Sequence, residues 1–213
     1  MEATDTIFYI AVLIMSVVIH EVSHGFMAEY FGDKTARHAG RLTLNPLKHL
    51  DLFGSIILPA FLILSHSPFL FGWAKPVPYN PENLSNKKWG TVAVAGAGVL
   101  ANFSIAIIFG IIIHFAPSFG LPAYDSFSPH PFYAITFIIV LVNLALGVFN
   151  LVPIPPLDGS KILLSLLPDS FSKIITFLEQ YAFILLLFFI IFFSGYLSPI
   201  LAFLFHLFTG IAF

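Results

Sequence analysis

Residues 6–25, "TIFYIAVLIMSVVIHEVSHG", place two histidines and a glutamate at the end of an apolar run that is suited to lipid. Ionisable side chains are rare inside membrane helices, and where they occur they mark functional sites. On a helix, His20 and His24 lie one turn apart on the same face, so both imidazoles can reach one metal ion, with Glu21 beside them. The stretch therefore predicts a metal site within a membrane helix. The alternative is that neighbouring backbone groups simply satisfy the two histidines.

The rest of the 213-residue chain is similarly apolar, with 58% hydrophobic and 9% charged residues and a mean hydropathy of +0.95. Six stretches approach the roughly 20 residues that cross a bilayer core of about 30 Å. They are residues 6–31, 52–71, 91–115, 132–152, 174–193 and 196–213. We therefore expect an all-α polytopic membrane protein with five to six transmembrane helices. It would be a single membrane-embedded domain over 1–213, with a core at about 6–165 and a C-terminal helical hairpin at about 170–213.

Composition also limits the ligands and partners. The chain has no cysteine, so a metal would have to be held by His, Asp, Glu or Asn side chains. The net charge is −2 and the basic residues form no stripe, which excludes nucleic acid as a partner.

The basic residues predict how the chain threads through the bilayer. Basic connections favour the cytoplasmic side. Seven of the nine lie in the first two connections: Lys34, Arg37, Arg41, Lys48, Lys75, Lys87 and Lys88. Both connections can be cytoplasmic only if the stretch between them, 52–71, turns back, so we expect a re-entrant or irregular element there. Such backbone must be buried in protein or line a wet cavity. The alternative is an ordinary spanning helix kinked at Pro59.

A catalytic zinc usually takes three protein ligands and keeps a fourth position open for water, whose pKa it lowers to about 7. The candidate third ligand is Asp158 in "NLVPIPPLDGS", residues 150–160, where three prolines interrupt the helical pattern. The alternative role for Asp158 is to cap the following helix. With a re-entrant element, His24 and Asp158 both lie toward the cytoplasmic ends of their spans. The threading and the ligand requirement therefore favour the same arrangement.

The two motifs together resemble the site-2 protease family of zinc intramembrane metalloproteases, in its compact form without extra soluble domains. The resemblance implies one Zn²⁺ per chain, held by His20, His24 and Asp158, with Glu21 as the catalytic base. It extends to "AGAGVLANF", 95–103, which is similar to the family's G-x-x-x-N element. Ala97 departs from the proline expected there.

Four further residues are candidates for substrate binding or transition-state support: Gly98, Asn102, Asn150 and Lys75. Gly98 and Asn102 are one turn apart, so the glycine allows a helix to approach while the amide bonds across the gap. Asn102 could steady a substrate carbonyl, or it could be a packing amide. Asn150 could orient Asp158 or bond a substrate strand, or it could be an ordinary amide at the end of a helix beside prolines. Lys75 lies in "KPVPYNP", 75–81, which is suited either to pairing with an extended substrate or to loop packing.

The sequence therefore predicts a zinc-dependent intramembrane endopeptidase that hydrolyses peptide bonds in or near the transmembrane segments of other membrane proteins. Its partners would be such a substrate and the lipid bilayer, and the sequence carries no signal for an oligomeric state. We expect a multi-pass protein of a prokaryotic cell membrane whose site opens toward the cytoplasm. The alternatives are a membrane metal-ion transporter, in which Glu21 would have no role, and a catalytically inactive membrane scaffold.

Overall fold

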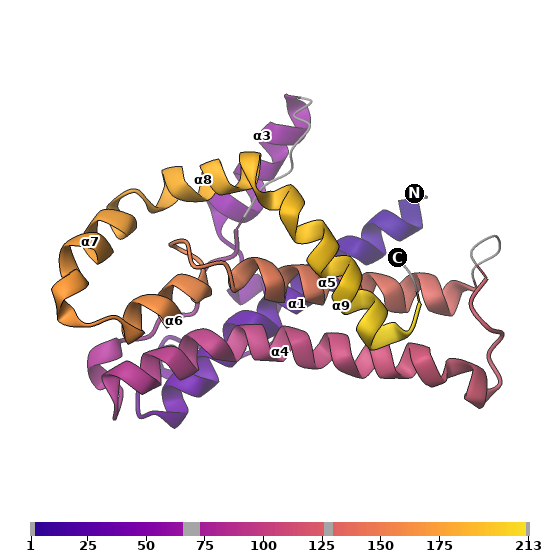
Figure 1. Ribbon diagram of the computed structural model, residues 1–213, viewed down its shortest axis with the longest axis horizontal. Helices are drawn as coiled ribbons and strands as arrows, with labels where there is room; N and C mark the ends of the chain where they lie inside the picture. Colours follow the sequence, from indigo (N-terminus) through magenta and orange to yellow (C-terminus); the bar gives the residue numbers. More distant parts are fainter. Residues whose placement is uncertain (1–2, 66–72, 126–129, 212–213) are drawn as a thin grey trace.

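A computed structural model describes residues 3–65, 73–125 and 130–211, and within these ranges the secondary structure is helical, with no strand (Figure 1). The main helices are α1 (Ala3–Tyr30), α2 (Thr35–His38), α3 (Leu58–Leu64), α4 (Lys87–Phe115), α5 (Pro131–Asn150), α6 (Asp158–Leu166), α7 (Ser172–Gln180), α8 (Ala182–Phe192) and α9 (Ser198–Thr209). Shorter helical turns are Pro46–Lys48, Leu52–Ile57, Pro81–Asn83, Ala116–Phe119, Asp169–Phe171 and Ser194–Leu197. The predicted all-α architecture is confirmed.

The three longest helices form the body of the molecule. Helix α4 packs against both α1 and α5, which also contact each other, and it runs antiparallel to both (Figure 1). On α1, Ser16 lies opposite Asn102 of α4, whereas His24 lies opposite Val94. Each of these helices is long and apolar enough to cross a membrane. Three predicted spans are therefore borne out by length and composition, and α1 and α5 run in the same direction.

Local sequence signals explain where these helices begin. The Asn86 side chain accepts a hydrogen bond from the Trp89 N–H at 3.0 Å, capping α4. Helix α5 starts with Pro131, whose missing N–H costs nothing in the first turn. Its preceding residue, His130, accepts from the Phe132 N–H at 3.2 Å.

Small residues on α4 let its neighbours approach closely. A Cβ at Gly98 would lie 2.6 Å from His24 Nε2, and a Cβ at Gly110 would lie 2.8 Å from backbone and side-chain atoms of Phe208 on α9. Ala106, between them, is fully buried. Because lipid gives no hydrophobic driving force between helices, such close packing is a main source of their attraction.

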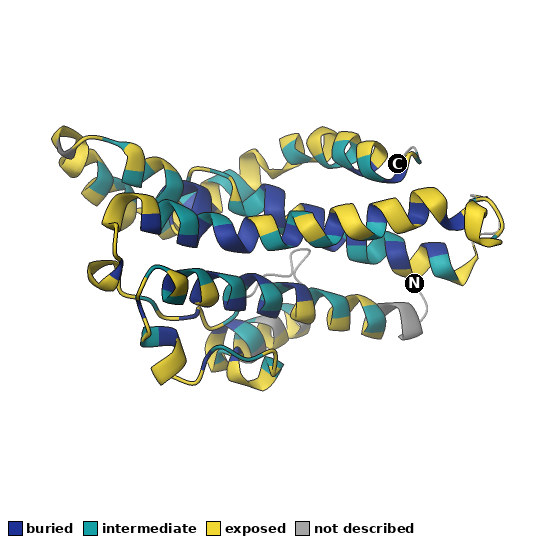
Figure 2. Ribbon diagram, turned by 90° about the horizontal axis from the view of Figure 1, so that it is seen from below, coloured by how far each residue is buried: buried dark blue, intermediate teal, exposed yellow. Residues whose placement is uncertain are grey.

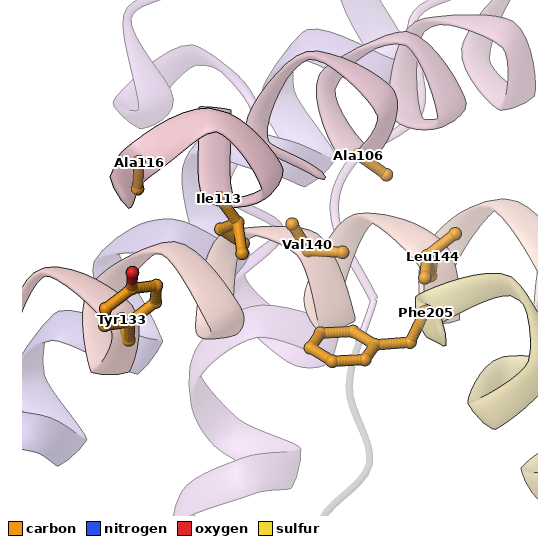
Figure 3. Close-up of a cluster of buried hydrophobic side chains, with 7 residues drawn as sticks. All are labelled: Ala106, Ile113, Ala116, Tyr133, Val140, Leu144 and Phe205. Carbon is orange, nitrogen blue, oxygen red and sulfur yellow. The ribbon is translucent and has the colours of Figure 1, made fainter. Parts of the chain in front are cut away.

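One apolar cluster ties the far ends of α4 and α5 to α9 (Figure 3). Ile113 of α4 packs with Tyr133 and Val140 of α5, and Phe205 of α9 completes the cluster. The Tyr133 hydroxyl donates to the Pro122 carbonyl at 2.8 Å, so its polar end is satisfied. Outside this core the long helices carry exposed residues (Figure 2), and on α4 these include Ile107, Ile108 and Ile111. Such an apolar surface on the long helices is typical of an integral membrane protein.

The predicted re-entrant stretch, 52–71, is described over residues 52–65. Its described part is a π-helical turn, Leu52–Ile57, that continues into α3, while 66–71 lie outside the described residues. The Trp73 N–H donates to the Gly54 carbonyl at 3.2 Å, and the Ser55 hydroxyl donates to the Trp73 carbonyl at 2.8 Å. The beginning of the stretch is therefore hydrogen-bonded to Trp73, the first described residue after it, as a re-entrant element requires.

The C-terminal region does not confirm the fourth and later spans that we expected. Helices α7 and α8 meet at Tyr181 with a bend of 69°. Residues Ser194–Thr209 form a shorter apolar segment. At 11 residues, α8 is only about 16 Å long at 1.5 Å per residue, too short to cross a bilayer alone. By length and composition the described chain has three candidate spans, or four if the bent pair counts as one, instead of five to six.

A buried carboxylate fixes the turn that follows α1. Asp33 is fully buried and accepts hydrogen bonds from Thr35 Oγ1 at 2.5 Å, Asn80 N–H at 2.7 Å and Asn83 Nδ2 at 2.9 Å. Burial raises the pKa of Asp33, but the donors from Asn83, Thr35 and Asn80 outweigh it and hold the pKa below its ordinary value. The ionised side chain therefore joins the end of α1 to the segment that leads into α4.

Substituting Asp33→Asn should destabilise the protein by about 1–3 kcal/mol, because an amide NH₂ would face donors where the carboxylate accepts. Thermal unfolding in neutral detergent at pH 7 measures the change. Because the folded pKa is lowered, the wild type's advantage should be present above the unfolded pKa of 3.8 and shrink as the pH falls below it. Glu82→Gln removes only an exposed ion pair with Lys87, so this control variant should change the unfolding temperature little. Equal unfolding temperatures for wild type and Asp33→Asn would contradict this assignment.

Candidate metal centre

The structure brings His20, His24 and Asp158 together. One ligand atom from each lies within 4.8 Å of the others, and all three residues are buried. Asp158 Oδ2 is 3.0 Å from His20 Nε2 and 3.1 Å from His24 Nε2. Two imidazole nitrogens and one carboxylate oxygen are a ligand set that suits zinc at a site with an open position.

Asp158 reaches this position because the chain turns tightly after α5. A Cβ at Gly159 would lie 2.1 Å from the Leu151 carbonyl oxygen, so only glycine lets the first turn of α6 lie against the end of α5. Asp158 is the first residue of α6, and the N-cap residue is Leu157. The capping role considered for Asp158 is therefore wrong, and its carboxylate contacts the two imidazoles instead.

Hydrogen bonds set the tautomer of both histidines. His24 Nδ1 lies 2.6 Å from the Val94 carbonyl oxygen, an acceptor, so Nδ1 carries the proton. His20 Nδ1 lies 2.6 Å from Asn102 Oδ1 and donates in the same way. In the neutral imidazoles both Nε2 atoms then present lone pairs toward the Asp158 carboxylate. Three acceptors that converge in this way suit a cation between them, so the residues present fit a metal ion.

Asn102 is held by a network that spans three helices. Its Nδ2 donates to Asn143 Oδ1 at 2.8 Å, and Asn143 Nδ2 donates to Ser16 Oγ at 3.0 Å. This fixes the amide orientation of Asn102, so that Oδ1 faces His20. Asn102 is fully buried, contacts His20 and is not among the residues that line the cavity described below.

The three ligand residues and Glu21 line one cavity of about 530 Å³. Its other walls are mostly apolar and come from α1, α4, the segment 73–79, the end of α5, α6 and α8. Glu21 Oε2 accepts a hydrogen bond from the Val77 N–H at 2.9 Å, which orients the carboxylate within the cavity. Burial raises the pKa of the Tyr79 phenol, so this wall residue stays protonated at neutral pH. The cavity combines a cation site, a carboxylate and an apolar wall.

The extended segment that holds Glu21 is bonded within the protein. The Lys75 N–H donates to the His49 carbonyl at 2.8 Å, and Arg41 Nη2 donates to the Lys75 carbonyl at 2.6 Å. Val77 gives its N–H to Glu21, while Pro76 and Pro78 have none. Within 75–78 every N–H is therefore used or absent, which leaves no donor there for pairing with an extended substrate.

Two other predicted residues lie differently from expectation. Asn150 lines the cavity, but its Nδ2 donates to the Leu146 carbonyl of its own helix at 2.9 Å, not to Asp158. Lys75 does not line this cavity, and its side chain lies in a separate pocket with Arg41.

Sequence reasoning missed Lys161, whose Nζ lies 3.0 Å from Asp158 Oδ1. Its spacing of three residues from Asp158 on a helix was the available signal. Asn143 is also absent from the predicted site residues, although a polar residue inside an apolar span is a functional candidate by the same argument as the histidines.

The substitution Gly98→Ala should weaken metal binding at least tenfold, because its Cβ would lie 2.6 Å from His24 Nε2 and 2.7 Å from His20 Nε2. Competition with a chromogenic zinc chelator measures the affinity, and circular dichroism checks that the helices remain. Gly96→Ala on the same helix is the matched control, since its Cβ would meet no atom within 4 Å. Equal affinity for zinc in the two variants would contradict the geometry.

Comparison with known proteins agrees with this geometry. The family model described as peptidase family M50 matches residues 8–194. "Putative zinc metalloprotease YwhC" of Bacillus subtilis is 37% identical over 182 residues, which cover 84% of this chain and 78% of the relative. "Putative zinc metalloprotease Rip2" of Mycolicibacterium smegmatis is 33% identical over 72% of this chain and 54% of its own length.

An archaeal protein is more distant. "Zinc metalloprotease MJ0392" of Methanocaldococcus jannaschii is 25% identical over 75% of this chain, which is 34% of that relative. No solved structure matches the chain. The family match covers most of the sequence, including both histidines and Asp158. The chain therefore belongs to peptidase family M50, the site-2 protease family of metalloproteases.

Proposed function

We propose that the protein is a zinc-dependent intramembrane endopeptidase, which hydrolyses peptide bonds in or near the membrane-spanning segments of other proteins. The observation that carries the proposal is the cavity in which His20, His24, Asp158 and Glu21 meet. His20 precedes the end of α1 at Tyr30 by about ten residues, or about 15 Å at 1.5 Å per residue. The reaction would therefore take place below the membrane surface.

His20 and His24 would hold zinc through Nε2, and Asp158 would hold it through Oδ2, the oxygen that faces both imidazoles. Zinc bound there would polarise the substrate carbonyl and lower the pKa of a water molecule. The chain prepares these ligands in advance, because Asn102 and the Val94 carbonyl fix both imidazoles from behind. Lys161 holds the other carboxylate oxygen, Oδ1.

Glu21 would be the general base and acid. The Val77 N–H occupies Oε2, so Oε1 would take a proton from the attacking water as its oxygen bonds to the amide carbon. Glu21 would then pass this proton to the amide nitrogen as the C–N bond breaks, leaving a carboxylate and an amine. The Val77 hydrogen bond keeps the carboxylate aimed while it exchanges the proton.

A membrane-spanning segment suits the apolar walls of the cavity, although it must be extended locally before its amide can be cut. We propose that the site opens toward the cytoplasm of a prokaryotic cell. Seven of nine basic residues lie in connections on the side of the bundle where α1 ends and α4 begins, which supports this orientation.

The substitution Glu21→Gln should lower proteolysis by at least a hundredfold while zinc content stays that of the wild type, because the amide cannot exchange the proton. The assay uses purified protein in proteoliposomes and a reporter with one transmembrane segment, with cleavage followed on gels. Glu29→Gln, on the same helix but paired with Arg37 at the surface, is the control and should stay active. Proteolysis by the Glu21→Gln variant would contradict the proposed role of Glu21. If the variant instead transported zinc into the proteoliposomes, the protein would be a metal-ion transporter.

Zinc content of the detergent-purified protein tests the ligands directly. The wild type should hold about one zinc per chain, and His24→Ala and Asp158→Ala should each lose most of it, since three protein ligands share the ion. His38→Ala, which removes an exposed histidine of α2, should keep it. Atomic emission measures the metal, and unchanged zinc in Asp158→Ala would place the third ligand elsewhere.

A further inference from the structure

Arg41 is a buried cation that has no acidic partner among the residues that the structure describes. Its side chain belongs to a residue that is only 7% exposed, and its Nη2 donates to the Lys75 and Pro76 carbonyls at 2.6 and 3.3 Å. Its Nε has no hydrogen-bond partner in the described part of the chain. A buried charge is stable only when hydrogen bonds and an opposite charge compensate for its lost hydration. Backbone carbonyls accept hydrogen bonds from Arg41, but none of the described residues supplies a carboxylate as the opposite charge.

Two more basic residues line the same cavity as Arg41. Arg41, Lys48 and Lys75 line a cavity of about 510 Å³, separate from the candidate metal centre, and none of its described lining residues is acidic. Lys48 is exposed, and no side-chain hydrogen bond or ion pair of its own is found in the described structure. Three basic residues around one opening, with no acidic residue among the described residues that line it, create a positive potential that attracts anions.

Apolar side chains beside the cavity indicate what kind of anion fits. Leu47 and Leu50 line the cavity as well, and Leu47 is 72% exposed. Leu44, on the same connection, is 55% exposed. A soluble anion has no apolar part that would contact these leucines. A lipid carries a charged headgroup and apolar acyl chains on one molecule. Basic residues next to a membrane helix attract anionic lipids.

We propose that this cavity binds the phosphate headgroup of an anionic phospholipid, with the acyl chains lying along Leu47 and Leu50. The phosphate would pair with Lys48 and Lys75 and would supply the negative charge that Arg41 lacks. The inference rests on the proposed placement in a bilayer but not on proteolysis.

The site is joined to the metal cavity through the backbone of one short segment. Arg41 holds the Lys75 and Pro76 carbonyls, and the next residue, Val77, gives its N–H to Glu21. A lipid bound at Arg41 would therefore stabilise the segment that orients Glu21. The site is then a place where the anionic lipid content of the membrane can influence the enzyme.

Thermal unfolding in neutral detergent tests the proposal without any substrate. Short-chain phosphatidylglycerol should raise the unfolding temperature of the wild type in a saturable way, and short-chain phosphatidylcholine should not. Lys48→Gln should weaken the apparent affinity for phosphatidylglycerol about fivefold, the effect of one basic residue near an anionic lipid. Lys48→Arg should retain the affinity. Lys34→Gln removes an exposed lysine of the same connection outside the cavity and should behave as the wild type.

Three outcomes would overturn the proposal. Equal stabilisation by the two lipids would show that charge is not recognised. Equal weakening in Lys34→Gln and Lys48→Gln would show that only general surface attraction is at work. Stabilisation by inorganic phosphate alone at the same concentration would identify a free anion as the ligand. Because none of these measurements involves cleavage, each leaves the proposed protease activity to its own test.

Discussion

Polar side chains inside the helix bundle must find their partners within the protein, because lipid offers none. Ser16 of α1, Asn102 of α4 and Asn143 of α5 meet this requirement together, and the chain of bonds ends on His20. Shifting any one of the three helices along its axis by one residue would break these bonds. The network therefore fixes the register of α1, α4 and α5, on which the positions of both histidines depend.

The candidate metal centre is consequently a product of helix packing. His20 and His24 come from α1, the groups that fix their tautomers come from α4, and Asp158 comes from the turn after α5. Gly98 provides the space in which the imidazoles lie against α4. Since the ligands meet only in the packed bundle, metal binding would also stabilise that packing.

The sequence could predict the histidine pair because helical periodicity alone places residues four apart on one face. The distribution of basic residues predicted that Asp158 lies near the two histidines. The antiparallel arrangement of α4 with α1 and α5 agrees with that prediction. The predicted family is confirmed. The bend between α7 and α8 was not predictable, because 174–193 is apolar nearly throughout and hydropathy reports length but not direction. The partners of Asn102, Arg41 and Lys75 depend on which segment lies opposite each side chain, which no local pattern states.

The short extended segment at residues 75–78, beside the cavity that holds Glu21, also bears on whether copies of the protein associate with one another. An extended chain with open N–H and C=O groups can recruit another copy of itself as a neighbouring strand. Here Pro76 and Pro78 lack N–H groups, those of Lys75 and Val77 are bonded, and Arg41 covers two of the carbonyls. Under the proposed function the cavity would admit foreign peptides, and the bonded segment beside it would still not start the pairing of one protein molecule with the next.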